Sequence, residues 1–408
     1  MDILVQKFGG TSVASLERMK EVMGKVKSGL DEGRKVIVVL SAMAGETNRL
    51  LAMAGEWAEK PDPAEVDTLV TTGEQVSVSL FSILLNAHGI KARSILAAQI
   101  PLTTDTVHGN ARILKIDGAR LRELLSFYDV LVVTGFQGVT HEGRVTTLGR
   151  GGSDTSAVAL AAALGSVPCD IYTDVDGVFT TDPNICSTAR KLDKVSYEEM
   201  LELSSMGAKV LHFRSVEFAQ KYNVPVRVRS TFSSNPGTLV TQEDDSMESV
   251  LVSGIAFDKN QARVTVLKVE DRPGVAATLF GAMSKANIIV DMIIQNMSAD
   301  GRTDMTFTVP QKDLEDTLAV MREIMPALGG EDVVADSNVA KVSVVGVGMR
   351  SHSGVAARIF EALKNENINI LMISTSEIKV TCLIDEKYTE LAVRVLHDVF
   401  DLGKEHIA

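Results

Sequence analysis

Near the start of the chain a lysine and a phenylalanine stand directly before two glycines and two hydroxyl residues, in the stretch Lys7–Ser12 (KFGGTS). The apolar run Ile3–Val5 predicts a buried strand before it, and Ser15–Lys27 predicts a helix after it. A strand that breaks into a glycine-rich turn before a helix suits the close approach of an anion such as phosphate. A tight strand-to-helix turn with no ligand explains these residues equally well.

A second glycine-rich stretch, Leu148–Ser156 (LGRGGSDTS), combines an arginine with the start of a predicted helix. Its glycines let the backbone approach a ligand, and Arg150 offers a planar pair of donors to a carboxylate or phosphate. Ser153 or Asp154 can cap the helix predicted over Thr155–Leu164, whose N-terminus favours negative charge. The stretch therefore indicates an anion site, and a capped turn with a surface arginine is the alternative.

A third stretch, Tyr172–Pro183 (YTDVDGVFTTDP), follows a predicted strand and carries acidic residues. Asp174 and Asp176 suit a metal or a ribose. The spacing is not that of an EF-hand, because no third acid follows two residues on and no glutamate closes the loop. The loop can wrap a nucleotide base and ribose, and a plain acidic turn is the alternative.

Two shorter stretches also carry polar groups near predicted strand or helix ends. Ser41–Gly45 (SAMAG) follows the strand Val36–Leu40 and leads towards Thr47, whereas Thr71–Glu74 (TTGE) precedes a helix. A glutamate at a helix start is usually a partner of the helix dipole. Glu74 can instead hold a substrate ammonium group, and the residues leave these two roles open.

The elements that must position these residues alternate along the first 241 residues. Short β-branched runs such as Val36–Leu40 and Val130–Thr134 alternate with longer periodic runs such as Gln75–His88 and Asp154–Leu164. This pattern predicts an α/β fold with a mainly parallel sheet sandwiched by helices. Ligands of such sheets bind at the carboxyl ends of the strands, which is where the glycine-rich stretches fall. Gly143–Thr147 predicts a hairpin near the same site.

The last third of the chain contains an internal repeat after a polar linker, Gln242–Ser249. The sequence GVAATLFGAMSKANIIVDMI from Gly274 matches GVAARIFEALKNENINILMI from Gly354, 80 residues later. Each copy predicts strand, helix, strand, strand and helix, which is most of a ferredoxin-like unit. A single unit of this size is marginally stable, so the two copies should pack together and form small-ligand sites at their shared face.

Composition and charge narrow the classes of function. The chain has 408 residues and a net charge of −12, which argues against nucleic acid or an anionic membrane as the main partner. Three scattered cysteines fit a reducing compartment, and no signal peptide or long apolar run is evident, so we expect a cytoplasmic protein. The seven histidines form no metal-ligand spacing, and P-loop, protein-kinase and dinucleotide motifs are absent.

Four motifs, KFGGTSVAS, TTGEQ, GRGGSDTSA and YTDVDGVFTTDP, occur in this order and together resemble the aspartate kinases of the amino-acid-kinase superfamily. DRPGVAA and SHSGVAA resemble the paired ACT regulatory domains of these enzymes. The resemblance covers nearly the whole chain. It implies a catalytic domain over residues 1–245 and ferredoxin-like ACT domains over 262–336 and 340–408, with a possible exchange of a strand or segment between the two.

This resemblance implies transfer of the γ-phosphoryl group of ATP, with Mg²⁺, to the β-carboxylate of L-aspartate. The product is 4-phospho-L-aspartate, at the entrance to lysine, threonine and methionine synthesis. A carboxylate with a pKa of about 3.9 is already ionised, so no general base is needed. The difficulty is to bring one anion up to another, so catalysis should consist of positioning and charge neutralisation.

The motifs also imply roles for individual residues. Lys7, Arg150 and Asp154 are expected to be catalytic, with Arg150 holding a substrate carboxylate and Asp154 organising Lys7 and the metal region. The substrate-binding positions are Ser41, Thr47, Glu74, Arg150 and Ser153. The ATP-binding positions are Lys7, Gly9, Gly10, Ser12, Gly151, Gly152, Thr173, Asp174, Phe179, Lys209 and Val210. No side chain is assigned to a metal with certainty, and Mg²⁺ is expected on the ATP phosphates.

The ACT resemblance implies feedback inhibition by amino-acid effectors. The matching positions are Asp271, Ala276, Asp291 and Gln295 in the first copy, and Val355, Asn369, Ile370, Thr375 and Ser376 in the second. Asp271 and Asp291 suit ammonium groups, so lysine and threonine are the expected effectors, unless these acids only cap helices and turns. We also expect a homo-oligomer through the ACT domains, or assembly with a shorter C-terminal subunit started at Met247.

Two alternatives remain beside this interpretation. A related kinase could act on another carboxylate, such as glutamate or an N-acetylated amino acid, although Glu74 favours a free ammonium group. The chain could also be an amino-acid sensor whose catalytic half no longer turns over. The presence of Lys7, Arg150, Asp154 and Asp174 argues against the sensor.

Overall fold

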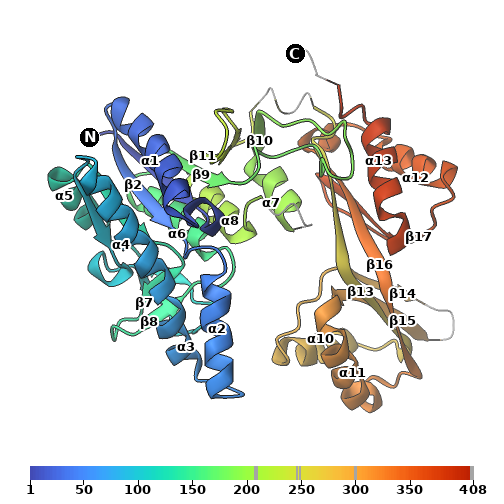
Figure 1. Ribbon diagram of the computed structural model, residues 1–408. Helices are drawn as coiled ribbons and strands as arrows, with labels where there is room; N and C mark the ends of the chain where they lie inside the picture. Colours follow the sequence, from blue (N-terminus) through green and yellow to red (C-terminus); the bar gives the residue numbers. More distant parts are fainter. Residues whose placement is uncertain (206–209, 245–246, 248–249, 298–300, 405–408) are drawn as a thin grey trace. The chain divides into compact units, whose positions relative to one another are not determined.

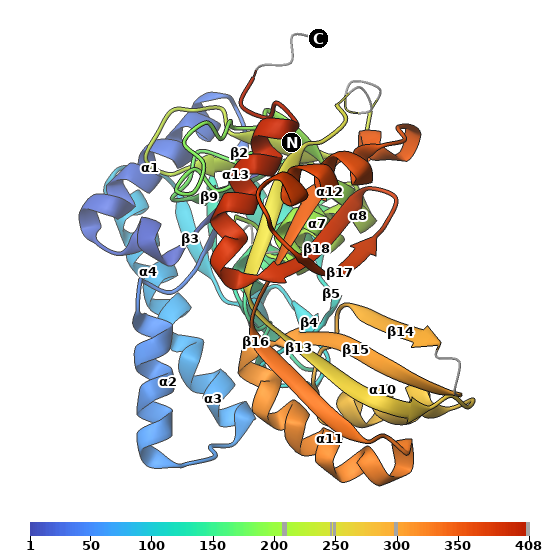
Figure 2. The ribbon, with the colours of Figure 1, turned by 90° about the vertical axis from the view of Figure 1, so that its right-hand side faces the viewer.

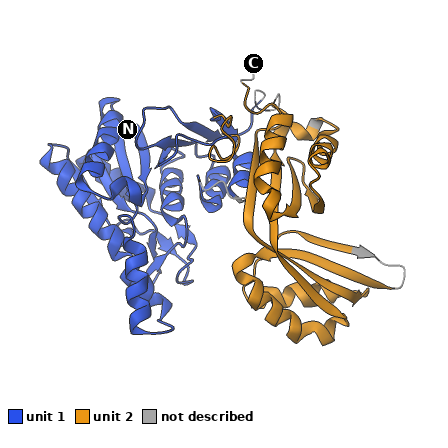
Figure 3. Cartoon of the chain, turned by 45° about the vertical axis from the view of Figure 1, so that its right-hand side comes forward, with its two compact units in different colours: residues 1–179, 191–249 blue, residues 180–190, 250–408 orange. Residues whose placement is uncertain are grey.

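The computed structural model describes all residues except 206–209, 245–246, 248–249, 298–300 and 405–408. The chain forms two compact units (Figure 3). The first contains residues 1–179 and 191–249, and the second contains residues 180–190 and 250–408. The short segment 180–190, which the sequence placed in the first domain, therefore makes its contacts in the second unit.

A large sheet forms the centre of the first unit (Figure 1). Its strand order is β10-β12-β11-β9-β1-β2-β6-β3, and every neighbouring pair is parallel except β11 with β12. The predicted α/β fold with a mainly parallel sheet is confirmed. The strands are β1 (Ile3–Phe8), β2 (Lys35–Leu40), β3 (Ala92–Ile95), β6 (Val130–Thr134), β9 (Cys169–Thr173), β10 (Lys194–Ser196), β11 (Val226–Ser230) and β12 (Thr238–Thr241).

Helices cover this sheet because their apolar faces have no other place to be buried. The helices α1 and α4 pack on the sheet through a core that includes Val22, Phe81 and Val38. Residues 152–161 of α6 are all buried, so this helix lies inside the unit rather than on its surface. The helices of the unit are α1 (Leu16–Asp31), α2 (Glu46–Trp57), α3 (Pro63–Val70), α4 (Thr72–Ala87), α5 (Gly118–Phe127), α6 (Gly152–Ala163), α7 (Tyr197–Ser205) and α8 (Phe213–Tyr222).

A small second sheet, with the order β5-β4-β7-β8, leads into the second glycine-rich stretch. Its strands are β4 (Thr103–Thr104), β5 (Ile113–Lys115), β7 (Gln137–Val139) and β8 (Val145–Thr147). β7 and β8 pair antiparallel, so the predicted hairpin is confirmed. Because β8 ends at Thr147, the hairpin delivers the chain directly to the turn that contains Arg150.

The helices α3 and α4 follow one another over Pro63–Ala87, a stretch of 25 residues that could cross a membrane by length and composition. The expectation from the sequence that the chain has no such run was therefore wrong. More than half of its most apolar window, 56%, is buried inside the protein. A helix of a protein core passes the same test, so this stretch gives no reason to place the chain in a bilayer.

In the second unit, a six-stranded antiparallel sheet carries both copies of the repeat, in the order β14-β15-β13-β16-β18-β17. Figure 2 shows α10 and α11 beside one half of the sheet and α12 and α13 beside the other. The first copy consists of β13 (Gly254–Glu270), α10 (Val275–Lys285), β14 (Ile293–Met297), β15 (Arg302–Pro310) and α11 (Leu314–Leu328). The second consists of β16 (Asp332–Val345), α12 (Val355–Asn365), β17 (Ile370–Thr375), β18 (Lys379–Asp385) and α13 (Thr389–Val399).

The repeat is visible in backbone conformation as well as in element order. Gly274 and Gly354 precede α10 and α12 with φ of +96° and +95°, values that side chains rarely allow. The two copies are also joined through their first strands, because Ile255 of β13 pairs with Val344 of β16. The first half of β13 thus lies in the sheet half that belongs to the second copy.

The segment Thr180–Arg190 packs within the second unit. The Thr180 carbonyl accepts a hydrogen bond from the backbone N–H of Ile255 at 2.7 Å. The Thr180 hydroxyl lies 3.0 Å from Nε2 of the fully buried His397 in α13. Ile185 packs against the core of the second repeat. The chain thus enters the second unit at Thr180, within the third polar stretch, and returns to the first unit at Lys191.

Candidate active site

Lys7 and Asp154 form an ion pair between the end of β1 and the first turn of α6. The distance from Nζ to Oδ1 is 2.6 Å, and the side chains are only 13% and 12% exposed. An ammonium group has three donors, so Lys7 keeps donor capacity for a further anion beside Asp154. A Cβ on Gly9 would lie 3.7 Å from Nζ, which places the ammonium over the first glycine turn.

Backbone contacts hold the first glycine turn against the loop that follows β2. A Cβ on Gly10 would meet the Ala42 carbonyl oxygen at 2.6 Å, so only glycine fits there without a shift of the backbone. The backbone N–H of Ala44 also donates to the Gly10 carbonyl at 3.2 Å. On the same loop the Ser41 hydroxyl donates to the Ser153 hydroxyl at 3.0 Å, which connects the loop to the first turn of α6.

Glu74 lies buried in the first turn of α4, with 2% of its surface exposed. Its Oε1 accepts a hydrogen bond from the backbone N–H of Ala42 at 3.0 Å. Its Oε2 has no partner among the described residues. Burial raises the pKa of Glu74 from 4.5 to about 7, against the lowering effect of the Ala42 hydrogen bond. A half-satisfied buried carboxylate of this kind is suited to bind a cation.

The Arg150 turn is shaped by glycines with positive φ. Gly149 and Gly151 have φ of +76° and +66°, and Gly151 caps α6 without a side-chain hydrogen bond. The prediction that Ser153 or Asp154 caps this helix was wrong, because both residues lie inside its first turn. They point their side chains to Ser41 and Lys7 instead. Arg150 is exposed, and it forms no hydrogen bond or ion pair with the described residues.

The third polar stretch begins at Thr173, where β9 ends. Asp174 is exposed and accepts a hydrogen bond from the Thr173 hydroxyl at 3.0 Å, whereas Asp176 accepts one from the Ser233 hydroxyl at 2.6 Å. Asp174 is therefore the freer of the two acids to meet a ligand. Phe179, later in the stretch, is half-buried.

Thr231 connects the first and third stretches and was not singled out from the sequence. Its hydroxyl lies 2.7 Å from the Ser12 hydroxyl, and its backbone N–H donates to the Thr173 carbonyl at 3.0 Å. Position 231 immediately follows β11, the strand next to β9 in the sheet. The only signal in the sequence was therefore its place at the carboxyl end of a predicted strand.

His212 is a second residue whose place the sequence did not reveal. Its ring packs on the Arg150 turn, since a Cβ on Gly151 would lie 2.2 Å from the His212 Cβ. Burial lowers the pKa of His212, and the charge of Asp154 opposes this effect. His212 thus packs against the glycine-rich turn, and its lowered pKa favours the neutral imidazole there.

The structure thus joins one part of the predicted site and leaves another part unconnected. Hydrogen bonds, charge contacts or close approach connect Lys7, Gly9, Gly10, Ser41, Glu74, Ser153 and Asp154. Thr47 is half-buried in the first turn of α2, and Val210 is half-buried just before α8. Lys209 lies outside the described residues. No group of three His, Cys, Asp or Glu residues that could hold a metal occurs in the described part of the chain.

The effector positions predicted in the repeats lie in the second unit, most of them exposed. Asp271, Ala276, Asp291, Gln295, Asn369, Thr375 and Ser376 are exposed, Ile370 is half-buried, and Val355 is buried at the start of α12. Asp291 already has a partner, because its carboxylate forms an ion pair with the buried ammonium of Lys341 from β16. Burial lowers the pKa of Lys341, and the contact with Asp291 opposes this effect.

Comparison with known proteins defines the class first. A family model described as the amino acid kinase family matches residues 2–230, and an ACT domain model matches residues 267–324 and 342–400. The catalytic fold and the repeats are therefore those of an amino acid kinase with ACT domains.

Individual relatives narrow this class. An aspartokinase of Pseudomonas aeruginosa is 54% identical over 404 residues and covers 98% of both chains. An aspartokinase of Corynebacterium glutamicum is 46% identical over 410 residues, covering 99% of this chain and 97% of the relative. The crystal structure of E. coli aspartokinase III with aspartate and ADP superposes with a TM-score of 0.79, at 30% identity over 98% and 99% of the chains. The chain belongs to the aspartate kinases, which makes it a phosphotransferase enzyme, and the resemblance read from the motifs is confirmed.

Proposed function

We propose that this chain transfers the γ-phosphoryl group of ATP to the β-carboxylate of L-aspartate. The buried Glu74, with one carboxylate oxygen unpartnered in the described structure, is the observation that carries the choice of a free amino acid. An α-ammonium group is the natural partner for that oxygen, whereas an N-acetylated amino acid has no charge to offer there. The E. coli relative crystallised with aspartate and ADP supports the same pair of substrates.

In this proposal the chain positions two anions and neutralises their charge. An oxygen of the ionised β-carboxylate attacks the γ-phosphorus, the bond from that phosphorus to the β-phosphate oxygen breaks, and ADP leaves with the electron pair. Lys7 places its ammonium beside the transferring group, and Asp154 holds Lys7 in position. The glycine turns bring backbone N–H groups to the phosphates, while Glu74 and Arg150 hold the ammonium and α-carboxylate of the acceptor.

Mg²⁺ fits this site as an ion carried by the nucleotide. The described residues offer no cluster of three ligating side chains, and Asp154 is already paired with Lys7. The ion would be bound mainly by phosphate oxygens, with the exposed Asp174 within the nucleotide stretch as a candidate second partner. When bound, it neutralises charge on the β- and γ-phosphates.

A hydroxylamine trap tests the proposed substrate directly. The enzyme is incubated with Mg²⁺, ATP and hydroxylamine, together with aspartate, glutamate or their N-acetyl derivatives, and hydroxamate is measured by colour. We expect hydroxamate from aspartate, because hydroxylamine captures an acyl phosphate. Product from another acid alone would replace the substrate, and no product from any acid would favour the sensor with an inactive catalytic half.

We further propose that lysine and threonine inhibit by binding at the ACT repeats. The support is the acidic character of two exposed positions, Asp271 and Asp291, in a repeat whose family binds amino acids. The pair of Asp291 with Lys341 adds a physical condition. An incoming ammonium group at Asp291 must compete with an ammonium that the chain itself supplies.

This competition gives a prediction for the regulatory half. Lys341→Met should lower the effector concentration for half-inhibition, by about tenfold, because Asp291 loses its resident cation. Asp291→Asn should raise that concentration, since it removes the acceptor charge. Inhibition curves with lysine, threonine and both together measure the shift. Equal shifts in the same direction for both variants would contradict a competition at Asp291.

Self-association is the remaining part of the proposal. Apolar side chains are exposed on both edge strands of the second sheet, with Ile293 of β14 at 50% and Ile373 of β17 at 42%. An exposed apolar strand edge is a surface that proteins normally cover. We propose that a second copy of the chain covers these edges.

The three cysteines are free and buried, which suits the reducing cytoplasm that we propose as the location.

A further inference from the structure

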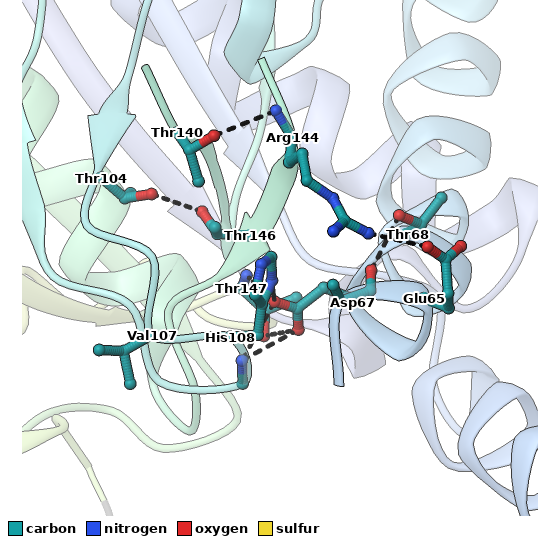
Figure 4. Close-up of polar contacts among 12 residues, drawn as sticks. Glu65, Asp67, Thr68, Thr104, Val107, His108, Thr140, Arg144, Thr146 and Thr147 are labelled. Atoms are coloured by element: carbon teal, nitrogen blue, oxygen red, sulfur yellow. Dashed lines mark hydrogen bonds and ion pairs between the residues drawn. The ribbon is translucent and has the colours of Figure 1, made fainter. Parts of the chain in front are cut away.

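Asp67 of α3 is a buried carboxylate that the mechanism above does not use. It is 2% exposed, and four donor groups surround it (Figure 4). His108 Nδ1 donates at 2.8 Å, and the backbone N–H of Gly109 donates at 3.1 Å. The Thr147 hydroxyl donates at 2.6 Å and its backbone N–H at 3.1 Å. A buried charge with this many donors is costly to disturb, because each donor would be left unpaired.

Asp67 connects two chain segments, and hydrogen bonds link both of them to the Arg150 turn. Thr147 ends β8, and the turn starts with the next residue. The other segment continues from Gly109 to Ala111, whose backbone N–H donates to the Thr147 carbonyl at 2.8 Å. Arg214 of α8 adds a second brace, since its guanidinium donates to the Leu148 carbonyl and, at 2.9 Å, to the Ala111 carbonyl.

The same helix also sets the start of the helix that carries Glu74. The backbone N–H of Thr71 donates to the Asp67 carbonyl at 3.2 Å, and α4 begins at the next residue. Gln137 of β7 donates to the Thr71 carbonyl at 3.3 Å, which ties this junction to the β7–β8 hairpin. Asp67 is therefore linked to the Arg150 turn through its side chain and to the helix that carries Glu74 through its backbone.

We propose that Asp67 is a positioning residue that fixes the separation of Glu74 from the Arg150 turn, and thereby the affinity of the site for the α-amino-acid group of the acceptor. This inference rests on the proposed function, in which Glu74 and Arg150 hold the ammonium and the carboxylate of that group. Both groups are attached to the same α-carbon, so their spacing is fixed and the residues that bind them must keep a matching separation. A change of this separation should weaken the binding of aspartate and leave the binding of ATP unchanged.

The test is Asp67→Asn, which keeps the shape but places an amide NH₂ against groups that are themselves donors. We expect the KM for aspartate to rise about tenfold, with kcat and the KM for ATP within twofold of the parent. Thermal unfolding and circular dichroism show whether the variant is folded. Thr147→Val, which removes only the 2.6 Å hydrogen bond, should act in the same direction with a smaller effect.

Glu65→Gln is the matched control, because it lies on the same helix and pairs with the same hairpin. Glu65 Oε1 accepts from Arg144 at 2.8 Å, but the pair is exposed, so its loss should leave the KM for aspartate unchanged. A folded Asp67→Asn variant that keeps the parent KM for aspartate, or in which the KM values for aspartate and ATP rise by the same factor, would overturn the inference. Failure of the parent enzyme to phosphorylate aspartate would instead contradict the proposed function.

Discussion

Lys7→Met is expected to lower kcat by about 10³-fold, with a much smaller change in the KM for aspartate. The methionine has nearly the same length but no charge, so the site keeps its shape and loses the cation nearest to the transferring group. That charge is needed most in the transition state, where two anions share the phosphorus. ADP release at saturating ATP and aspartate measures kcat directly.

Two further variants separate catalysis from stability. Lys35→Met removes a lysine at the opposite end of the sheet, where Lys35 Nζ pairs with Asp129 at 2.7 Å, and it should keep kcat. The double variant Lys7→Met with Asp154→Asn removes the unpaired buried charge that the single change leaves. If this double variant regained the parent kcat, or if Lys7→Met kept more than a tenth of it, the role of Lys7 would be refuted.

Glu74→Gln should raise the KM for aspartate by about 10²-fold or more and increase stability at the same time. Gln keeps an oxygen for the Ala42 N–H but cannot offer a charge to the substrate ammonium. The pKa of about 7 means that the folded parent binds a proton more readily than the unfolded chain, with its ordinary value of 4.5. Stability contributed by this group therefore falls as pH rises from 4.5 to 7, by up to roughly 3 kcal/mol, and Gln removes that loss.

The same pKa predicts the pH dependence of the parent enzyme. Below pH 7 Glu74 is protonated in the free enzyme, so kcat/KM for aspartate should fall up to tenfold per pH unit, whereas the Gln variant should be flat in this range. Glu199→Gln is the control: Glu199 is equally buried at the start of α7 but accepts from the Ser196 N–H and hydroxyl. It should lose stability and keep the KM. A Glu74 variant that behaves in this second way would show that Glu74 is only a structural acid.

The parts of this protein that were predictable are those encoded by neighbours in the sequence. The glycine stretches fix local backbone conformations, and the repeat is visible as two similar stretches 80 residues apart, so the sheet and the repeats could be anticipated. The pairing of Lys7 with Asp154 was expected only from the resemblance to aspartate kinases. Contacts between distant segments could not. Asp67 meets Thr147, and Ser12 meets Thr231, across 80 and 219 positions, and no local pattern selects those partners.

The helix-capping prediction, which rested on local sequence preference, was wrong because contacts with other elements decided the structure. Ser153 and Asp154 are good capping residues, yet both are drawn away from capping by partners on other elements, Ser41 and Lys7. Gly151, with a positive φ, takes the N-cap position of α6 instead. In the candidate active site, contacts with other elements therefore outweigh the capping preference of Ser153 and Asp154. Such conflicts with local preference are expected at functional sites.

Residues 180–190 come from the first half of the chain but belong to the second unit. Neither half of the chain is therefore complete without the other. A catalytic half ending at the linker would keep this segment but lose its partners, leaving Ile185 without the core against which it packs. A C-terminal piece beginning at Met247 would have the reverse defect, with His397 and Ile255 missing the hydroxyl and carbonyl of Thr180. Such a piece would therefore lack the eleven residues 180–190 that complete its core, and a full-length chain or a separate catalytic half could supply them.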